Sequence, residues 1–69
     1  MKLDIYGRFR LEIIREGDRW VAFELDGGKR MRQQELIIPS GLAASEIASY
    51  LDDLYHEMSR PGDRITEIA

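Results

Sequence analysis

The chain has 69 residues and no cysteine, 43% of its residues are hydrophobic, and its net charge is -3 at pH 7. This length suits one domain over residues 1–69, and the lack of cysteine excludes disulfides, thiolate metal sites and thiol nucleophiles. No segment is apolar over the length that a signal peptide or a membrane span requires, so we expect a cytoplasmic protein without membrane partners.

The first predicted strand lies in LDIYGRFRLEII, residues 3–14. Its apolar residues alternate with polar ones, which is the period of a half-buried antiparallel strand. Gly7 keeps the alternation and is expected to mark a bulge or a bend. The residues predicted to face the core are Leu3, Ile5, Phe9, Leu11 and Ile13.

The second strand is predicted in WVAFEL, residues 20–25, after a hairpin turn in REGDR, residues 15–19. Val21, Phe23 and Leu25 are expected to face the core. A second loop is predicted in DGGKR, residues 26–30, because adjacent glycines tolerate the positive φ of a tight turn. The third strand is predicted in QELII, residues 34–38, with Leu36 and Ile38 facing inward and Pro39 ending it.

The hydrophobic period becomes helical from Ala43 or Ala44. One apolar stripe is formed by Ile47, Leu51, Leu54 and Met58, and RPG at residues 60–62 ends the helix. The tail DRITEI, residues 63–68, has some strand character and is a candidate for a fourth, short strand at a sheet edge.

These elements predict a two-layer α+β domain, with one amphipathic helix packed on one face of a three-stranded antiparallel sheet. The order is β-β-β-α, with an optional short C-terminal strand. The predicted core consists of Leu3, Ile5, Phe9, Leu11, Ile13, Val21, Phe23, Leu25, Leu36, Ile38, Ile47, Leu51, Leu54 and Met58.

The stretch YLDDLYHEMSRPG, residues 50–62, contains the only histidine of the chain. A helical wheel places Ser45, Ser49, Asp52 and His56 opposite the apolar stripe, and Asp52 and His56 can form a surface pair. A catalytic triad needs a water-excluded cleft with oxyanion donors, and an exposed helix face offers neither. One imidazole with neighbouring carboxylates also supplies too few ligands for catalytic zinc. We predict a solvated polar face.

The loop DGGKR has a phosphate-binding interpretation as well, because main-chain amides and the adjacent Lys29 and Arg30 suit an anion. It lacks the spacing of a P-loop and precedes a strand, so an ordinary hairpin turn is favoured. We therefore predict no catalytic, cofactor-binding or metal-binding residues, and a protein that is not an enzyme.

The outer sheet face is the strongest candidate for function, since aromatic and basic residues are expected to interleave on it. Its predicted members are Tyr6, Arg8, Arg10 and Trp20. Tryptophan, tyrosine and arginine are enriched at interface hot spots, and sheets that bind nucleic acid present a similar pattern. A pI near 5.0 disfavours nucleic acid. We favour a module that binds protein through this face or a sheet edge, with nucleic-acid binding as the alternative.

Self-association is a natural form of such binding, because charge is unevenly distributed. Residues 1–33 hold eight basic and six acidic groups, whereas residues 34–69 hold two basic and seven acidic groups. A basic sheet face and an acidic helix face of two copies would complement each other.

The stretches KLDIYGRFRLE, residues 2–12, and YLDDLYHEMSRPG resemble a family of similarly short, uncharacterised bacterial proteins over nearly the whole chain. The resemblance implies an autonomous bacterial domain and assigns no activity. The element order is also similar to that of the DNA-binding domains of plant AP2-type factors and of phage-integrase arm-binding domains. That likeness is one of fold order alone, without a sequence motif, and the acidic composition departs from those domains.

Overall fold

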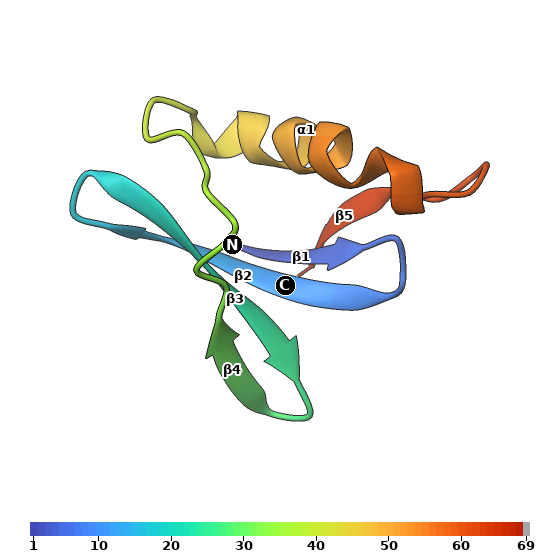
Figure 1. Ribbon diagram of the computed structural model, residues 1–69, viewed down its shortest axis with the longest axis horizontal. Coiled ribbons are helices and arrows are strands. Elements are labelled where there is room, and N and C mark those ends of the chain that lie inside the picture. The colour runs from blue at the N-terminus through green and yellow to red at the C-terminus, as the bar shows by residue number, and fades with distance from the viewer. Residues whose placement is uncertain (69) are drawn as a thin grey trace.

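The computed structural model describes residues 1–68, and in this part of the chain a five-stranded antiparallel sheet carries one α-helix on one face (Figure 1). The strand order is β4-β3-β2-β1-β5. The elements are β1 (Lys2–Ile5), β2 (Phe9–Glu16), β3 (Arg19–Asp26), β4 (Lys29–Arg32), α1 (Ala44–Tyr55), the 3-10 turn η1 (His56–Met58) and β5 (Ile65–Ile68). The α+β class and the single helix are confirmed, but the prediction of three strands is wrong.

The first predicted strand is in fact two strands, because the chain reverses at Tyr6 and Gly7. Both residues have positive φ, 57° and 71°, and the Arg8 N–H donates to the Ile5 carbonyl at 2.9 Å. β1 and β2 pair with Ile5 opposite Phe9. This three-residue connection keeps odd-numbered residues on one face of both strands, so the inward residues were predicted correctly although the turn was missed.

The β2–β3 hairpin is where the predicted direction of the side chains is wrong. Gly17 and Asp18 form a two-residue turn that pairs Glu16 with Arg19, and the register continues to Ile13 opposite Ala22. Directly paired residues share a face, so even-numbered residues of β3 face α1. Trp20, Ala22 and Glu24 therefore lie toward the helix. Val21, Phe23 and Leu25, predicted to pack under the helix, lie on the opposite face.

The third predicted strand, residues 34–38, is also wrong, since the strand lies earlier at Lys29–Arg32. Gly27 and Gly28, with φ of 56° and 82°, form a two-residue turn, so Lys29 and Arg30 belong to β4 and not to a loop. Residues 33–43, here called the connection, lead from β4 to α1. Leu36 is half-buried and Ile38 is buried, so both still contribute to the core from outside the sheet.

Helix α1 begins beside Ala43, whose N–H donates to Glu46 Oε1 at 2.8 Å, and Ile47 and Leu51 are fully buried against the sheet. Leu54 and Met58 were predicted in the core but are 51% and 38% exposed. After Leu51 the contact passes to Tyr55, whose ring meets the Phe9 ring edge to face at 5.5 Å. The last two predicted apolar positions of the helix therefore lie largely outside the core.

The predicted C-terminal strand is confirmed, because β5 pairs antiparallel with β1 and forms one edge of the sheet. The buried core cluster consists of Leu3, Ile5, Tyr6, Leu11, Ile13, Ala22, Ile38, Ile47 and Leu51. No helix of the described residues is long and apolar enough to cross a membrane.

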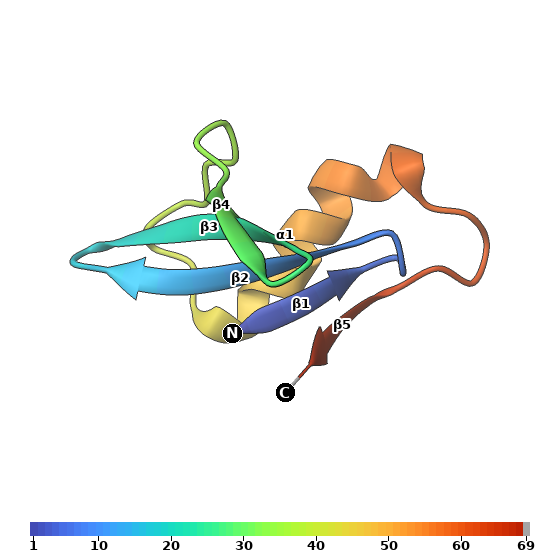
Figure 2. The ribbon, with the colours of Figure 1, turned by 90° about the horizontal axis from the view of Figure 1, so that it is seen from below.

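The face of the sheet away from α1, here called the open face, is covered by no helix of residues 1–68 (Figure 2). It carries the apolar residues Ile14, Val21, Phe23 and Leu25, of which only Val21 is buried. Arginines cover part of this strip: the Arg30 guanidinium lies 4.2 Å from the Phe23 ring centroid and bonds Glu12 at 3.0 Å. Aliphatic stems and cation–π contact thereby shield apolar surface that no second layer covers.

The two leucines of α1 test which part of the helix holds the core. Leu51→Ala removes a fully buried side chain and is expected to lower the free energy of unfolding by about 2–5 kcal/mol. Leu54→Ala, on the same helix but half-exposed, should cost less than about 1 kcal/mol. Urea unfolding of both variants measures the difference, and equal losses would contradict the packing described above.

Candidate interaction cleft

The four residues predicted to form one interaction face do not share a surface. Tyr6 lies in the β1–β2 turn with 7% of its surface exposed, and Arg8 lies in the same turn and is exposed. Arg10 lies on the open face, paired with Asp4 and Leu25, whereas Trp20 faces α1. The predicted common face is therefore wrong, because it required the β3 side chains to have the opposite direction. A binding role for each residue stays a prediction.

Tyr6 joins the β1–β2 turn to the helix. Its hydroxyl donates to the Asp52 carboxylate. Burial, followed by the hydrogen bond and the charge of Asp52, raises the pKa of Tyr6 from 10.0 to about 12. Tyrosine with positive φ is uncommon, and this contact to α1 helps hold the turn in that conformation.

The same contact separates the serine, aspartate and histidine of the helix. Asp52 is bonded to Tyr6 rather than paired with His56, which is a correction of the expected surface pair. The His56 Nδ1 lies 2.8 Å from the Asp53 carbonyl oxygen, and Ser49 is exposed. These side chains therefore do not form a hydrogen-bonded relay. Among the described residues, no group of three or more histidine, cysteine, aspartate or glutamate side chains is placed to hold a metal ion.

Trp20 anchors the connection instead of forming an outer surface. Its indole Nε1–H donates to the Leu42 carbonyl at 3.0 Å, and the Arg15 guanidinium lies 4.8 Å from the ring centroid. Arg15 also donates to the Ser40 carbonyl at 2.9 Å. On the helix side, the Tyr50 hydroxyl donates to the Ile37 carbonyl at 2.9 Å. The connection is thus fixed by side chains from β2, β3 and α1.

The first half of β3 has an open edge, because β4 ends at Arg32, opposite Phe23. The Gln33 N–H still donates to the Ala22 carbonyl at 2.8 Å, which shows that Ala22 directs its main-chain groups toward the β4 side. Main-chain groups alternate in direction along a strand, so Trp20 directs its N–H and C=O to that side as well. Beyond Gln33 the connection leaves the sheet, and no strand of the described residues pairs with this side of Trp20.

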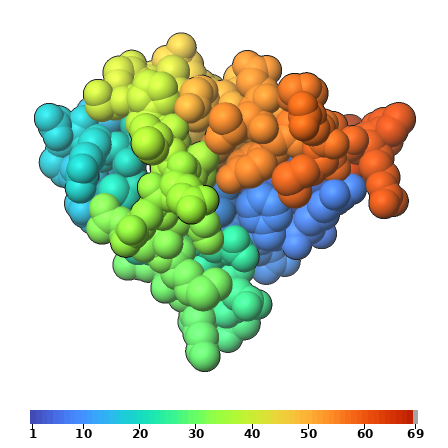
Figure 3. Space-filling model, in the orientation of Figure 1, coloured from blue at the N-terminus to red at the C-terminus, as the bar shows by residue number. Residues whose placement is uncertain are grey.

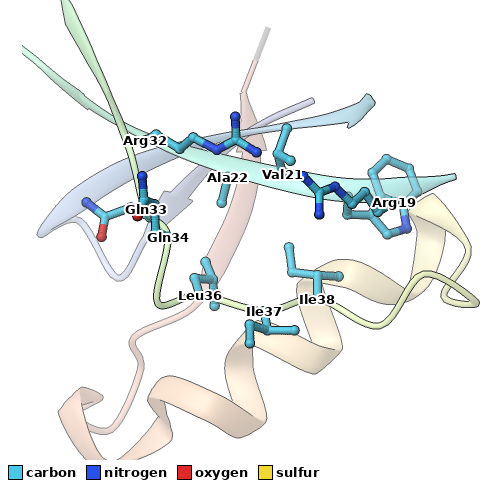
Figure 4. A pocket seen from close by; sticks show the side chains of 10 residues that line it. Arg19, Val21, Ala22, Arg32, Gln33, Gln34, Leu36, Ile37 and Ile38 are labelled. Atoms are coloured by element: carbon cyan, nitrogen blue, oxygen red, sulfur yellow. The ribbon is translucent and has the colours of Figure 1, made fainter. Parts of the chain in front are cut away.

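A cleft of about 430 Å³, here called the β3-edge cleft, lies between this open edge and the connection (Figure 4). β3 forms one wall of the cleft, and the connection forms the other. Leu36 and Ile38 point toward β3, whereas Ile37 points to the opposite side of the connection and lies at the rim of the cleft (Figure 4). Ile37 is 75% exposed, although its carbonyl is held by Tyr50. Figure 3 shows the connection, green to yellow-green, running over the surface toward α1. A rigid apolar wall therefore faces an unpaired strand edge.

The charged residues of the cleft are arginines. Arg19 and Arg32 line it together with Gln33 and Gln34. Arg32 lies 3.7 Å from Glu16, an exposed and therefore weak ion pair, and Glu24 is engaged by the Gln33 side-chain amide at 3.1 Å. The cleft thus combines main-chain donors and acceptors, an apolar wall and positive charge, a set of features that suits an extended peptide rather than bond-making chemistry.

The sequence analysis predicts binding at a sheet edge, but it does not identify the open edge of β3. Leu36, Ile37 and Ile38 were interpreted as a strand because they are apolar and precede a proline. Three consecutive apolar residues do not fit the alternation of a half-buried strand, and this signal could have indicated a segment packed along its length with one side chain left outside.

Comparison with known proteins gives a family for the whole chain. The model of a family described as "Domain of unknown function (DUF7661)" matches residues 1–69. The match fits the expected uncharacterised family, while its bacterial origin and the quoted sequence pattern stay predictions. No curated protein and no solved structure matches the chain.

Amide hydrogen exchange tests the open edge of β3. Trp20 directs its N–H away from β2, whereas Val21 lies opposite Ile14 with its N–H directed toward β2. The Trp20 amide is expected to exchange at least about tenfold faster than the Val21 amide in the free protein. Equal protection of the two amides, measured residue by residue by NMR, would show that the edge is covered.

The Tyr6 contact predicts a loss of stability in alkali. The pKa of Tyr6 is raised in the folded state to about 12. The stabilisation that its neutral hydroxyl contributes is therefore complete below pH 10.0, and it is lost as the pH rises through about 12. Over this range the free energy of unfolding should fall less steeply for Tyr6→Phe than for the wild type. Urea unfolding of both proteins at a series of alkaline pH values provides the measurement, and parallel slopes for the two would refute the assignment.

Proposed function

The chain belongs to this family of unknown function, DUF7661, and we propose that it is a non-enzymatic protein-interaction module that binds an extended segment of a partner protein in the β3-edge cleft. The segment adds to the sheet as a strand beside Arg19–Ala22. We place this activity in the cytoplasm, in keeping with the cysteine-free composition.

The observation that carries the proposal is the unpaired half of β3 beside a fixed apolar wall. In strand addition, main-chain hydrogen bonds supply affinity and side-chain contacts supply specificity. Trp20 offers main-chain hydrogen bonds through its outward N–H and C=O groups. Leu36 and Ile37 offer apolar side-chain contacts. The tethers from Arg15, Trp20 and Tyr50 hold the wall before a ligand arrives, which lowers the entropic cost of binding.

The cleft favours a segment that is apolar with acidic residues near it. The cleft has an exposed isoleucine, Ile37, at its rim, and Arg19 and Arg32 line the same cleft. A carboxylate of the partner placed near these guanidinium groups gains a charge-assisted hydrogen bond. A basic segment would instead meet like charge, so the arginines discriminate between partners.

The two outer edges of the sheet are less suited to strand addition. β4 carries Lys29, Arg30 and Arg32 among its four residues, and charged edges discourage pairing. β5 also has four residues, and Glu67 is exposed on it. The half of β3 left free by β4 is short as well, but it is the edge that has an apolar wall beside it.

Nucleic-acid binding through Tyr6, Arg8, Arg10 and Trp20 is no longer the second candidate. That interpretation depended on rings and guanidinium groups lying on one surface, and the rings of Tyr6 and Trp20 are both engaged with the core. We therefore argue only the protein-binding function.

The proposal is tested with two exposed apolar residues that differ in their position. Peptides that bind the wild-type protein are selected from a library of random linear sequences. One selected peptide is synthesised, and its affinity for the wild type and the variants is measured by titration. Ile37→Glu should weaken its binding about tenfold or more, a loss of at least about 1.4 kcal/mol. Leu54→Glu, the same change on the exposed part of α1, should leave the affinity unchanged.

Hydrogen exchange distinguishes strand addition from binding elsewhere. In the complex, the Trp20 amide should become protected from exchange. A peptide that binds Ile37→Glu as tightly as the wild type, or that leaves Trp20 unprotected, would overturn the proposal. Selected sequences without acidic residues would overturn the assigned role of Arg19 and Arg32. Self-association through the cleft would appear as a mass that rises with protein concentration and falls with Ile37→Glu.

A further inference from the structure

A second cleft of about 430 Å³ lies at the β3–β4 turn, and it gathers basic residues from three strands. Lys2 comes from β1, Arg10 from β2, and Lys29 and Arg30 from β4, with the Gly27–Gly28 turn beside them. We infer that this basic cleft is a binding site for the phosphate or diphosphate group of a small molecule. It is separate from the β3-edge cleft and shares no residue with it.

The fold brings these residues together through the register of the sheet. Arg30, Leu25, Arg10 and Asp4 are directly paired across four neighbouring strands, and Lys2 lies opposite Glu12 one step further along. All of them project from the open face. Figure 1 shows the β3–β4 hairpin extending away from α1.

The charge of the cleft is positive in a protein whose net charge is -3. Its lining has four basic residues and a single carboxylate, Asp26. Two further carboxylates lie close by: Glu12 bonds Arg30 at 3.0 Å, and Asp4 lies 4.0 Å from Arg10 in an exposed contact. Among the described residues, no ion pair within 4.0 Å involves Lys2 or Lys29. An excess of positive charge therefore remains for a ligand.

The side chains differ in what they offer an anion. Arg30 is held by Glu12 and by the Phe23 ring, so its guanidinium is already in place before a ligand binds. Guanidinium groups bind phosphate oxygens through parallel N–H donors, and lysine adds a mobile point charge. The amides of Gly27 and Gly28 lie outside the paired positions of β3 and β4, which end at Asp26 and Lys29. They add donors that the sheet does not use.

The size and the mixed lining favour a small ligand over a long polyanion. Leu25 and Ile68 contribute apolar surface at the cleft, which suits the organic part of a phosphate ester. Asp26 in the lining and the nearby Glu12 would repel the continuous backbone of a nucleic acid on either side of one bound phosphate. We therefore take one phosphate or diphosphate group as the ligand chemistry, free or esterified.

The test uses the two lysines, which are the only lysines of the chain. The full-length, isotope-labelled protein is titrated with inorganic phosphate and with pyrophosphate, against sodium chloride at equal ionic strength. Saturable chemical-shift changes are expected at the Gly27 and Gly28 amides. The double substitution Lys2→Gln, Lys29→Gln should weaken binding on the order of tenfold. Arg64→Gln, which removes one exposed positive charge outside the cleft, is the control and should have little effect.

Several results separate the outcomes. Shifts that sodium chloride reproduces, or an affinity unchanged by the double substitution, would overturn the inference. A nucleoside diphosphate that binds more tightly than pyrophosphate supports an esterified ligand, whereas equal affinity supports a free one. A single-stranded oligonucleotide could bind more tightly than all of these, with chemical-shift changes spread along the open face. That result would overturn the inference of a small ligand in favour of nucleic acid. The Ile37→Glu variant should bind pyrophosphate normally, so this test is independent of the β3-edge cleft.

Discussion

The register of the β2–β3 hairpin determines most of what this protein presents to its surroundings. A two-residue turn at Gly17–Asp18 pairs Glu16 with Arg19, and from that point every β3 side chain has a fixed face. Trp20 is directed toward the helix side, where it holds the connection. Phe23 and Leu25 are placed on the open face among arginines. The same register directs the main chain of Trp20 toward the side that β4 leaves uncovered.

The sequence predicts the structure correctly where the deciding pattern lies within a few neighbouring residues. The alternation in β1 and β2, the turn at Gly17 and the burial of Ile47 and Leu51 all follow from period and turn chemistry. The direction of the β3 side chains also follows from the turn. A two-residue turn pairs odd-numbered residues of β2 with even-numbered residues of β3, so the inward positions change from odd to even. This change was missed because Val21, Phe23 and Leu25 are more apolar than Trp20, Ala22 and Glu24, and hydrophobicity was given more weight than turn geometry.

Other features depend on contacts between distant parts of the chain and were beyond a sequence-based prediction. Leu54 fits the apolar stripe of α1, but its burial depends on how the helix packs against the sheet, and it is half-exposed. The pairing of Lys2 with Glu12 brings a β1 lysine near the β3–β4 turn, although 27 residues separate it from Lys29 in the sequence numbering. The β3-edge cleft exists because β4 is four residues long and β3 is eight.

The confinement of both lysines to the basic cleft has a practical consequence for handling the protein. Reagents that couple to lysine side chains can attach only at this cleft. Coupling of the lysines to an amine-reactive surface would therefore attach the molecule through the basic cleft and leave the β3-edge cleft, whose cations are arginines, unmodified. Lysine acylation would in turn act on this one cleft, because it removes two charges that no ion pair within residues 1–68 engages.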